Sequence, residues 1–139
     1  MDISLDKFSK EILNAAMNFK KGTEAKKFMR REGSKLRKKT KAKAKLLVGK
    51  KTGRYLKSIK RGKVYNYKGE KDLSIRAYST DNKAHLIEKG HIIKSRDGKE
   101  HGFKKGEYIF EKSNNEFEDQ FYEDCSEFVD YMLDEVGLT

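Results

Sequence analysis

The sequence of 139 residues predicts an α+β fold. Apolar residues recur every three or four positions towards both ends of the chain, which is the spacing of amphipathic helices. Between residues 55 and 78 they alternate with polar residues, which is the period of a strand. The chain contains no proline, so long helices are not interrupted. We therefore predict a long N-terminal helix, a small antiparallel β-sheet with a short helix, and a long C-terminal amphipathic helix packed on the sheet.

The N-terminal region, residues 1–49, is predicted to be basic and helical. Residues 4–21 have one apolar stripe, and a weaker stripe continues through residues 24–45. The densest positive run, residues 35–45, consists of good helix formers, but like charges one turn apart repel each other. A helix there needs an acidic partner. Gly49 is suited to the turn that ends it.

The remaining residues, 50–139, are predicted to form an α+β core, and the whole chain a single domain. Residues 55–67 are interpreted as one strand or a bent pair, joined by a turn to a strand at 73–78 in an antiparallel hairpin. Leu73, Ile75 and Ala77 share one face of that second strand, and Ser74, Arg76 and Tyr78 share the other.

A short helix is predicted at residues 84–89, with Asp81-Asn82 as its cap and Gly90 at its end. Residues 92–106 contain three glycines and no sustained period, so they are interpreted as a long mobile loop.

The segment 107–136 is the clearest predicted helix. Its apolar stripe is rich in aromatic residues, its opposite face is acidic, and Gly137 follows its end. The stripe includes Phe117, Phe121, Cys125, Phe128 and Met132. Cys125 is therefore expected to be a small core residue rather than a reactive thiol.

The charge of the chain, +11 in all, is distributed unevenly. Residues 1–63 carry +17, residues 64–110 carry +3 and residues 111–139 carry −9. Such polarity is typical of identical copies that pack head to tail, and it is equally compatible with two solvated helical faces. Because only 35% of residues are hydrophobic, we expect a small core that neighbouring copies complete.

Catalytic and metal sites are not indicated by the sequence. His85, Glu88 and His91 do not have the spacing of a zinc-binding His-Glu-x-x-His motif. No nucleophile motif or phosphate-binding loop is present, so we predict neither an enzyme nor a cofactor. No apolar run reaches about eighteen residues and no signal peptide is recognised, so we expect no membrane partner.

Two motifs give a more specific indication. Thr52-Gly-Arg-Tyr-Leu-Lys-Ser-Ile-Lys60 and Ala84-His-Leu-Ile-Glu-Lys-Gly-His91 resemble the signature of the head–tail joining, or tail-completion, neck proteins of tailed bacteriophages. The matching positions are Thr52, Gly53, Leu56, Ser58, Ile59, Ala84, Leu86, Ile87, Glu88, Gly90 and His91. Gly106-Glu107-Tyr108 stands where the family has a Gly-x-Pro-type segment.

The resemblance implies a structural subunit of the tail-terminator type that forms or joins a ring, commonly six-fold, capping the tail tube and linking it to neck or stopper proteins. DNA would pass only transiently through the lumen. The protein would lie in the virion, at the neck or tail top, and in the host cytoplasm during assembly.

The resemblance also suggests contacts between copies or with partners. Gly90 would permit a turn closed to larger residues, and Glu88 would pair with a lysine of the basic helix, within one copy or between copies. The residues expected at such contacts are Lys38, Lys41, Lys45, Arg54, Tyr55, Ser58, Glu88, Gly90, His91, Arg96, Lys104 and Lys105.

The alternative hypothesis is a sequence-nonspecific nucleic-acid-binding protein. Residues 20–63 have enough positive charge to displace counterions from a phosphate backbone, although no recognised nucleic-acid-binding motif is present.

Overall fold

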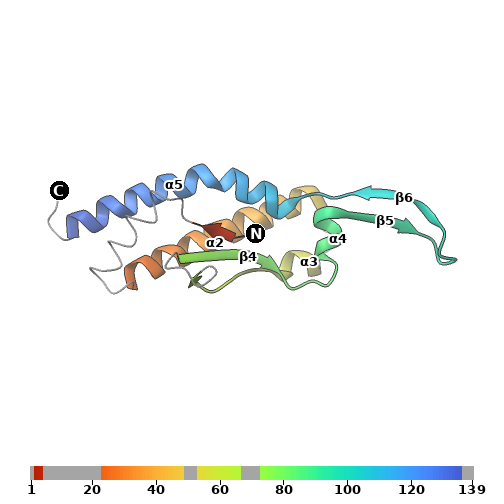
Figure 1. Cartoon of the computed structure of the whole chain (residues 1–139), viewed down its shortest axis with the longest axis horizontal. Helices are drawn as coiled ribbons and strands as arrows, with labels where there is room; N and C mark the ends of the chain where they lie inside the picture. The colour runs from red at the N-terminus through yellow and green to blue at the C-terminus, as the bar shows by residue number, and fades with distance from the viewer. Residues whose placement is uncertain (1, 5–22, 49–52, 67–72, 136–139) are drawn as a thin grey trace.

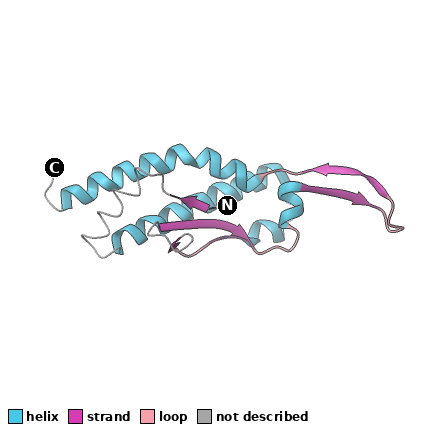
Figure 2. Ribbon diagram, in the orientation of Figure 1, coloured by secondary structure: helices cyan, strands magenta, loops and turns pink. Residues whose placement is uncertain are grey.

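A computed structural model describes residues 2–4, 23–48, 53–66 and 73–135 and confirms the α+β class (Figure 1). Two long antiparallel helices lie side by side, and a small sheet lies against one of them. A two-stranded hairpin projects from one end of this body, so the molecule is elongated (Figure 2).

The long helices are α2 (Thr23–Val48) and α5 (Ile109–Glu135). The apolar stripe predicted on α5 is confirmed, because its residues are buried against α2 and the rest of the core. They are Ile109, Phe110, Phe117, Phe121, Cys125, Phe128 and Met132. The Phe28 ring of α2 stacks on Phe128 and Phe121, with ring centroids 4.6 Å and 6.3 Å apart. Stacked aromatic pairs contribute about 0.5–1.5 kcal/mol beyond burial of their area.

The acidic partner that the basic run requires is α5 of the same chain. Lys35 Nζ donates to Asp124 at 2.8 Å, and Lys43 Nζ donates to Glu116 at 2.5 Å. Lys39 Nζ lies 3.9 Å from the same glutamate. The hydrogen bond from Lys43 holds the pKa of Glu116 below its ordinary value. One row of lysines on α2 is therefore compensated within the molecule.

The central strand of the sheet is β4 (Leu73–Ser79), and every pairing in this sheet is antiparallel. β1 (Asp2–Ser4) lies along one edge of β4; β2 (Ile59–Arg61) and β3 (Tyr65–Asn66) lie along the other.

The three residues predicted to share one face of β4 lie in the core: Leu73, Ile75 and Ala77 are at most 2% exposed. Ser74, predicted on the opposite face, is buried as well. Gly33 of α2 allows the close approach of helix and sheet, because a Cβ there would lie 2.5 Å from Cδ1 of Ile75.

The prediction of a strand from residue 55 is wrong for its first residues, which form the short helix α3 (Gly53–Ser58). Tyr55 and Ile59 are four residues apart, and that spacing places two side chains on one face of a helix as well as of a strand. Both are buried here. Tertiary packing rather than the local period therefore decides the conformation.

The predicted short helix is confirmed as α4 (Ala84–Lys89), but its predicted cap is not. The Asp81 carboxylate accepts a hydrogen bond from the backbone N–H of Lys83 at 2.9 Å, in a turn before the helix. The interpretation of residues 92–106 as a loop is also wrong. Gly90–Lys94 and Glu100–Lys105 are the strands β5 and β6 of the projecting hairpin.

Other predicted features lie outside the described residues: residues 5–21 of the first helix, Gly49, the turn at 67–72 and Gly137. Ser4, expected at the start of that first helix, belongs to β1.

A buried acid in α2 is the most unusual feature of the core. Glu32 is fully buried, and no donor among the described residues makes a hydrogen bond to its oxygens. Its nearest cation is Lys35, at 3.7 Å. Burial, followed by the hydrogen bond to Asp124, raises the pKa of Glu32 to about 8. The carboxyl is therefore protonated at neutral pH.

Burial by itself would raise the pKa of Asp124. Hydrogen bonds from Glu32, Lys35 and Gln120 outweigh it and hold that pKa below its ordinary value.

The buried Glu32 beside Asp124 predicts that the free energy of unfolding declines as pH rises. Because the pKa of Glu32 rises from 4.5 to about 8 on folding, the protonated carboxyl contributes to the free energy of unfolding. This contribution is complete below pH 4.5 and is lost as pH rises through 8. We expect the free energy of unfolding of Glu32→Gln to equal that of the wild type at pH 5 and to exceed it by roughly 3 kcal/mol at pH 9. Denaturant unfolding across pH 5–9 measures this.

The control is Glu123→Gln, at an exposed position of α5, which should keep the decline of the wild type. Parallel pH profiles for Glu32→Gln and the wild type would contradict the assignment.

Candidate functional site

The projecting hairpin is the candidate site. β5 and β6 pair with each other in their own two-stranded sheet, and their register places His91 opposite Lys104 and Ile92 opposite Phe103. A bulge follows between Ile92 and Lys94. An isolated two-stranded hairpin is only marginally stable in water, because it has no apolar layer to cover it.

Apolar side chains are exposed along both strands of the hairpin. The exposed fraction is 49% for Ile92, 41% for Ile93 and 62% for Phe103. The cross-strand pair of Ile92 and Phe103 places two of these side chains on one face. Clustered exposed apolar residues rimmed by charge are typical of protein–protein contact sites.

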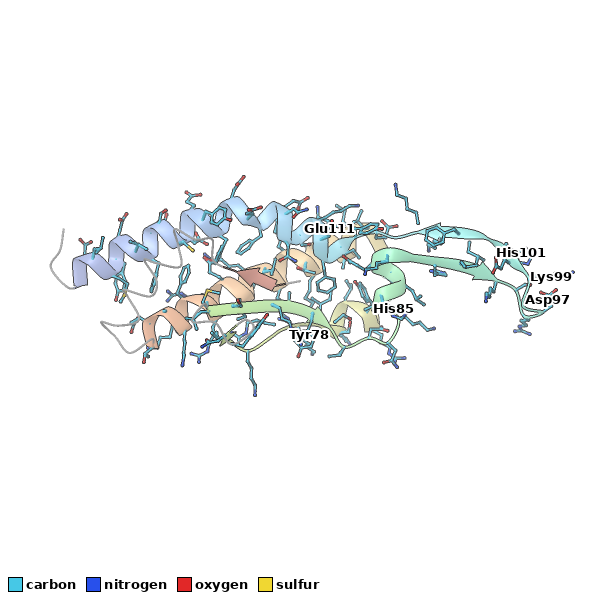
Figure 3. All side chains as sticks on the ribbon, viewed as in Figure 1. Tyr78, His85, Asp97, Lys99, His101 and Glu111 are labelled. Carbon is cyan, nitrogen blue, oxygen red and sulfur yellow. The ribbon has the colours of Figure 1, made fainter. Side chains whose placement is uncertain are left out.

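The charge of the hairpin is positive. Residues 90–105 contain five lysines and arginines against two acids, a net charge of +3. Asp97 and Lys99 lie at the tip and His101 just behind it on β6 (Figure 3). The tip turn is held by Asp97, which accepts hydrogen bonds from the Ser95 hydroxyl and from the Lys99 N–H. The hydroxyl, followed by that N–H, lowers the pKa of Asp97.

The base of the hairpin is fixed by close backbone packing. Gly90 has φ of +89°, and a Cβ there would collide with the Lys104 carbonyl oxygen. A Cβ on Gly106 would collide with the Glu88 carbonyl oxygen. Each of these two positions therefore requires glycine. The turn expected at Gly90 is confirmed, and Gly106 faces it across the base.

Glu88 joins the base of the hairpin to α5. Its two carboxylate oxygens accept hydrogen bonds from the N–H groups of Phe110 and Glu111, at 3.0 Å and 3.1 Å. The first N–H groups of a helix have no partner in the helix and carry partial positive charge, so a carboxylate stabilises them. Within the described residues Glu88 caps α5, and its pairing with a lysine of another copy stays a prediction.

Two backbone hydrogen bonds complete this junction. The Ile87 carbonyl accepts from Glu107 N–H at 2.8 Å, and the Glu88 carbonyl accepts from Tyr108 N–H at 3.0 Å. Tyr108 has φ of +50°, the one positive value at a non-glycine residue in the described part of the chain. It stands where the resembled family has a proline-containing segment. The hairpin is thus attached to the body through several directional contacts.

The predicted contact residues divide into three groups. Lys38, Lys45, Arg54, Arg96, Lys104 and Lys105 are exposed, whereas Lys41, Glu88, Gly90 and His91 are half-buried. Five of them, Glu88, Gly90, His91, Lys104 and Lys105, meet at the hairpin base. There a cavity of about 140 Å³ separates His91 and Lys104 from Leu47 and Val48 at the end of α2.

Tyr55 and Ser58 are buried in the core, so neither is available to a partner on the surface of this chain. Burial raises the pKa of Tyr55 to about 12. The Ser58 hydroxyl bonds to the Tyr55 carbonyl and the Ser79 hydroxyl, which ties α3 to β4. The sequence did not single out Ile92, Ile93 or Phe103, although three large apolar residues in a basic, glycine-containing segment are a usable signal.

Within the described residues, no group of three or more histidine, cysteine, aspartate or glutamate side chains could hold a metal ion. His85 is exposed rather than packed, on the outer side of α4. None of the described helices combines the length and apolar character needed to cross a membrane.

Glu88→Ala tests the junction. Removal of both acceptors should lower the free energy of unfolding by about 1–2 kcal/mol and speed amide exchange at Phe110 and Glu111. Lys89→Ala, at the exposed neighbouring position, is the control and should change neither. Equal effects of the two substitutions on exchange would show that Glu88 does not cap α5. Hydrogen–deuterium exchange and thermal unfolding measure the two effects.

No family model matches this chain, and neither a curated protein nor a solved structure matches it.

Proposed function

We propose that this chain is a structural subunit of the head–tail connector or tail terminus of a tailed phage or phage-tail-like particle. It forms or joins a ring that caps the tail tube and links it to neck or stopper proteins. In this role it is not an enzyme, and DNA passes only transiently through the ring. It resides in the virion, and in the host cytoplasm during assembly.

The observation that carries this proposal is the projecting hairpin on its fixed base. Ile92 is 49% exposed and Phe103 is 62% exposed, on a pair of strands that form their own two-stranded sheet. Within the described part of the chain each strand pairs on one side only, and a free strand edge is a template for pairing with another chain. The projecting hairpin (called the arm below) would gain stability when a partner covers it, which is the expected behaviour of an assembly subunit.

The places of the two resembled motifs support the same role. The first motif reaches from α3 into β2, and the second forms α4 and the start of β5. Three residues of the motifs have structural roles: Ser58 ties α3 to β4, Glu88 caps α5 and Gly90 allows the turn into the hairpin. The motifs therefore help to fix the shape of the chain around the hairpin.

The proposal predicts that the arm is needed for assembly and not for folding. Phe103→Ser, in the hairpin, should weaken self-association or tail binding by about tenfold or more, because its large apolar contact is lost. It should leave the unfolding temperature almost unchanged, because Phe103 is 62% exposed. Sedimentation velocity and negative-stain microscopy, alone and with tail tubes, measure assembly.

Leu46→Ser is the matched control, because Leu46 is 79% exposed and belongs to α2 rather than to the strands of the hairpin. A wild-type chain that stays monomeric alone and binds no tail tube at any concentration would contradict the proposed function.

Nucleic-acid binding remains the second candidate, because several cations of α2 are exposed and point away from its paired row. They include Lys26, Arg30, Lys38 and Lys45. A binder that neutralises several phosphates loses affinity steeply with salt. If this candidate is correct, the affinity for a short DNA duplex should fall about a hundredfold or more between 50 and 200 mM salt. Fluorescence anisotropy measures it; a connector subunit should show weak binding throughout.

A further inference from the structure

A pocket lies at the end of the body opposite the hairpin, between the N-terminal half of α2 and the C-terminal half of α5. Its volume is about 440 Å³. Phe28 and Phe128 form apolar walls, and Tyr131, which is 50% exposed, stands at the rim. α2 begins and α5 ends at this end of the molecule, whereas the hairpin projects from the other end (Figure 1).

The polar lining of the pocket has more carboxyl groups than cations. Four carboxyl groups line it, from Glu24, Glu32, Asp124 and Glu127, against two cations, Arg31 and Lys35. Glu32 is fully buried, and no donor from the described residues makes a hydrogen bond to its oxygens. Lys35 already donates to Asp124. A pocket of this kind accepts a cationic side chain, because a guanidinium supplies five N–H donors and stacks on aromatic rings.

The hairpin supplies such a side chain. Arg96 is exposed in the turn between β5 and β6, and residues 90–105 carry a net charge of +3. The α5 face beside the pocket is acidic and exposed at Glu123, Glu127 and Asp130. The positive arm and the negative face lie at opposite ends of the molecule. They therefore match between copies placed head to tail, and this arrangement closes into a ring when the rotation per subunit permits it.

We propose that this pocket between α2 and α5 receives the hairpin tip of a second copy of the chain, with Arg96 as the inserted residue. The guanidinium lies beside the carboxyl groups of Glu32 and Asp124 and against the Tyr131 ring. The inference rests on the proposed function, because it names the contact by which subunits of a ring would join. It gives each copy one donor arm and one receptor pocket.

Charge reversal on the arm tests the inserted residue. Arg96→Glu should weaken self-association at least tenfold, and Arg96→Lys should recover only part of it, because lysine lacks the planar fork. Lys57→Glu, an equal charge change at an exposed position of α3 that is not among the expected contact residues, is the control and should leave association within about twofold. Equal losses in Arg96→Glu and Lys57→Glu would overturn the assignment of Arg96.

Disulfide trapping tests the geometry in the full-length chain. Lys99→Cys places a thiol in the hairpin tip, and Tyr131→Cys places one at the pocket rim. Mixed and oxidised gently, the two variants should give a dimer containing one copy of each, and either variant alone should give much less. Wild-type protein is the control for Cys125, which is buried.

The outcomes separate this inference from the function on which it rests. If the wild type assembles and the mixture gives no mixed dimer, the pocket is not the receptor and the connector role stands. Strong dimers of Lys99→Cys alone would indicate hairpin-to-hairpin contact and would also overturn the inference. If the wild type neither self-associates nor binds tail tubes, both proposals fail.

Discussion

The antiparallel packing of α2 on α5 is the contact on which the other parts of the structure depend. Phe28 inserts between two phenylalanines of α5, and the lysines at 35, 39 and 43 reach acids on the same helix. The apolar contacts supply most of the free energy, since partly exposed ion pairs contribute little each. The ion pairs have a different role: they relieve the repulsion that a run of like charges would impose on α2. The helix pair then offers one side to the sheet.

The helix pair also determines where the arm projects. α5 begins at the hairpin base, and Glu88, in the last turn of α4, accepts hydrogen bonds from its first N–H groups. Two glycines bring the strands and the α4 end into backbone contact. A rigid base and an uncovered arm form a sensible combination for assembly, because a fixed direction lowers the entropy lost when a partner binds. The exposed apolar residues then provide the contact area.

The structure shows where the unevenly distributed charges of the chain lie. Part of the positive N-terminal charge is used within the molecule against α5, and the remainder faces solvent. The positive hairpin and the acidic end of α5 lie at opposite ends of an elongated body (Figure 1). Head-to-tail matching between copies therefore depends on the hairpin and the pocket rather than on the chain termini as such. The buried Glu32 at the pocket floor is where this arrangement departs most from an ordinary core.

The sequence by itself determined the features that local period reports: the α+β class, α5 with its aromatic stripe, α4, and the face of β4 that Leu73, Ile75 and Ala77 share. The need for glycine at position 90 followed from the turn after α4. Tertiary structure alone decided the rest. Tyr55 and Ile59 satisfy both periods, and packing against the core selects the helix there. The hairpin has polar, glycine-containing strands without alternation, so only the long-range pairing of its two strands identifies it. The partner of Glu88 lies more than twenty residues away, and a spacing rule along the chain cannot specify which donors reach a carboxylate across that distance.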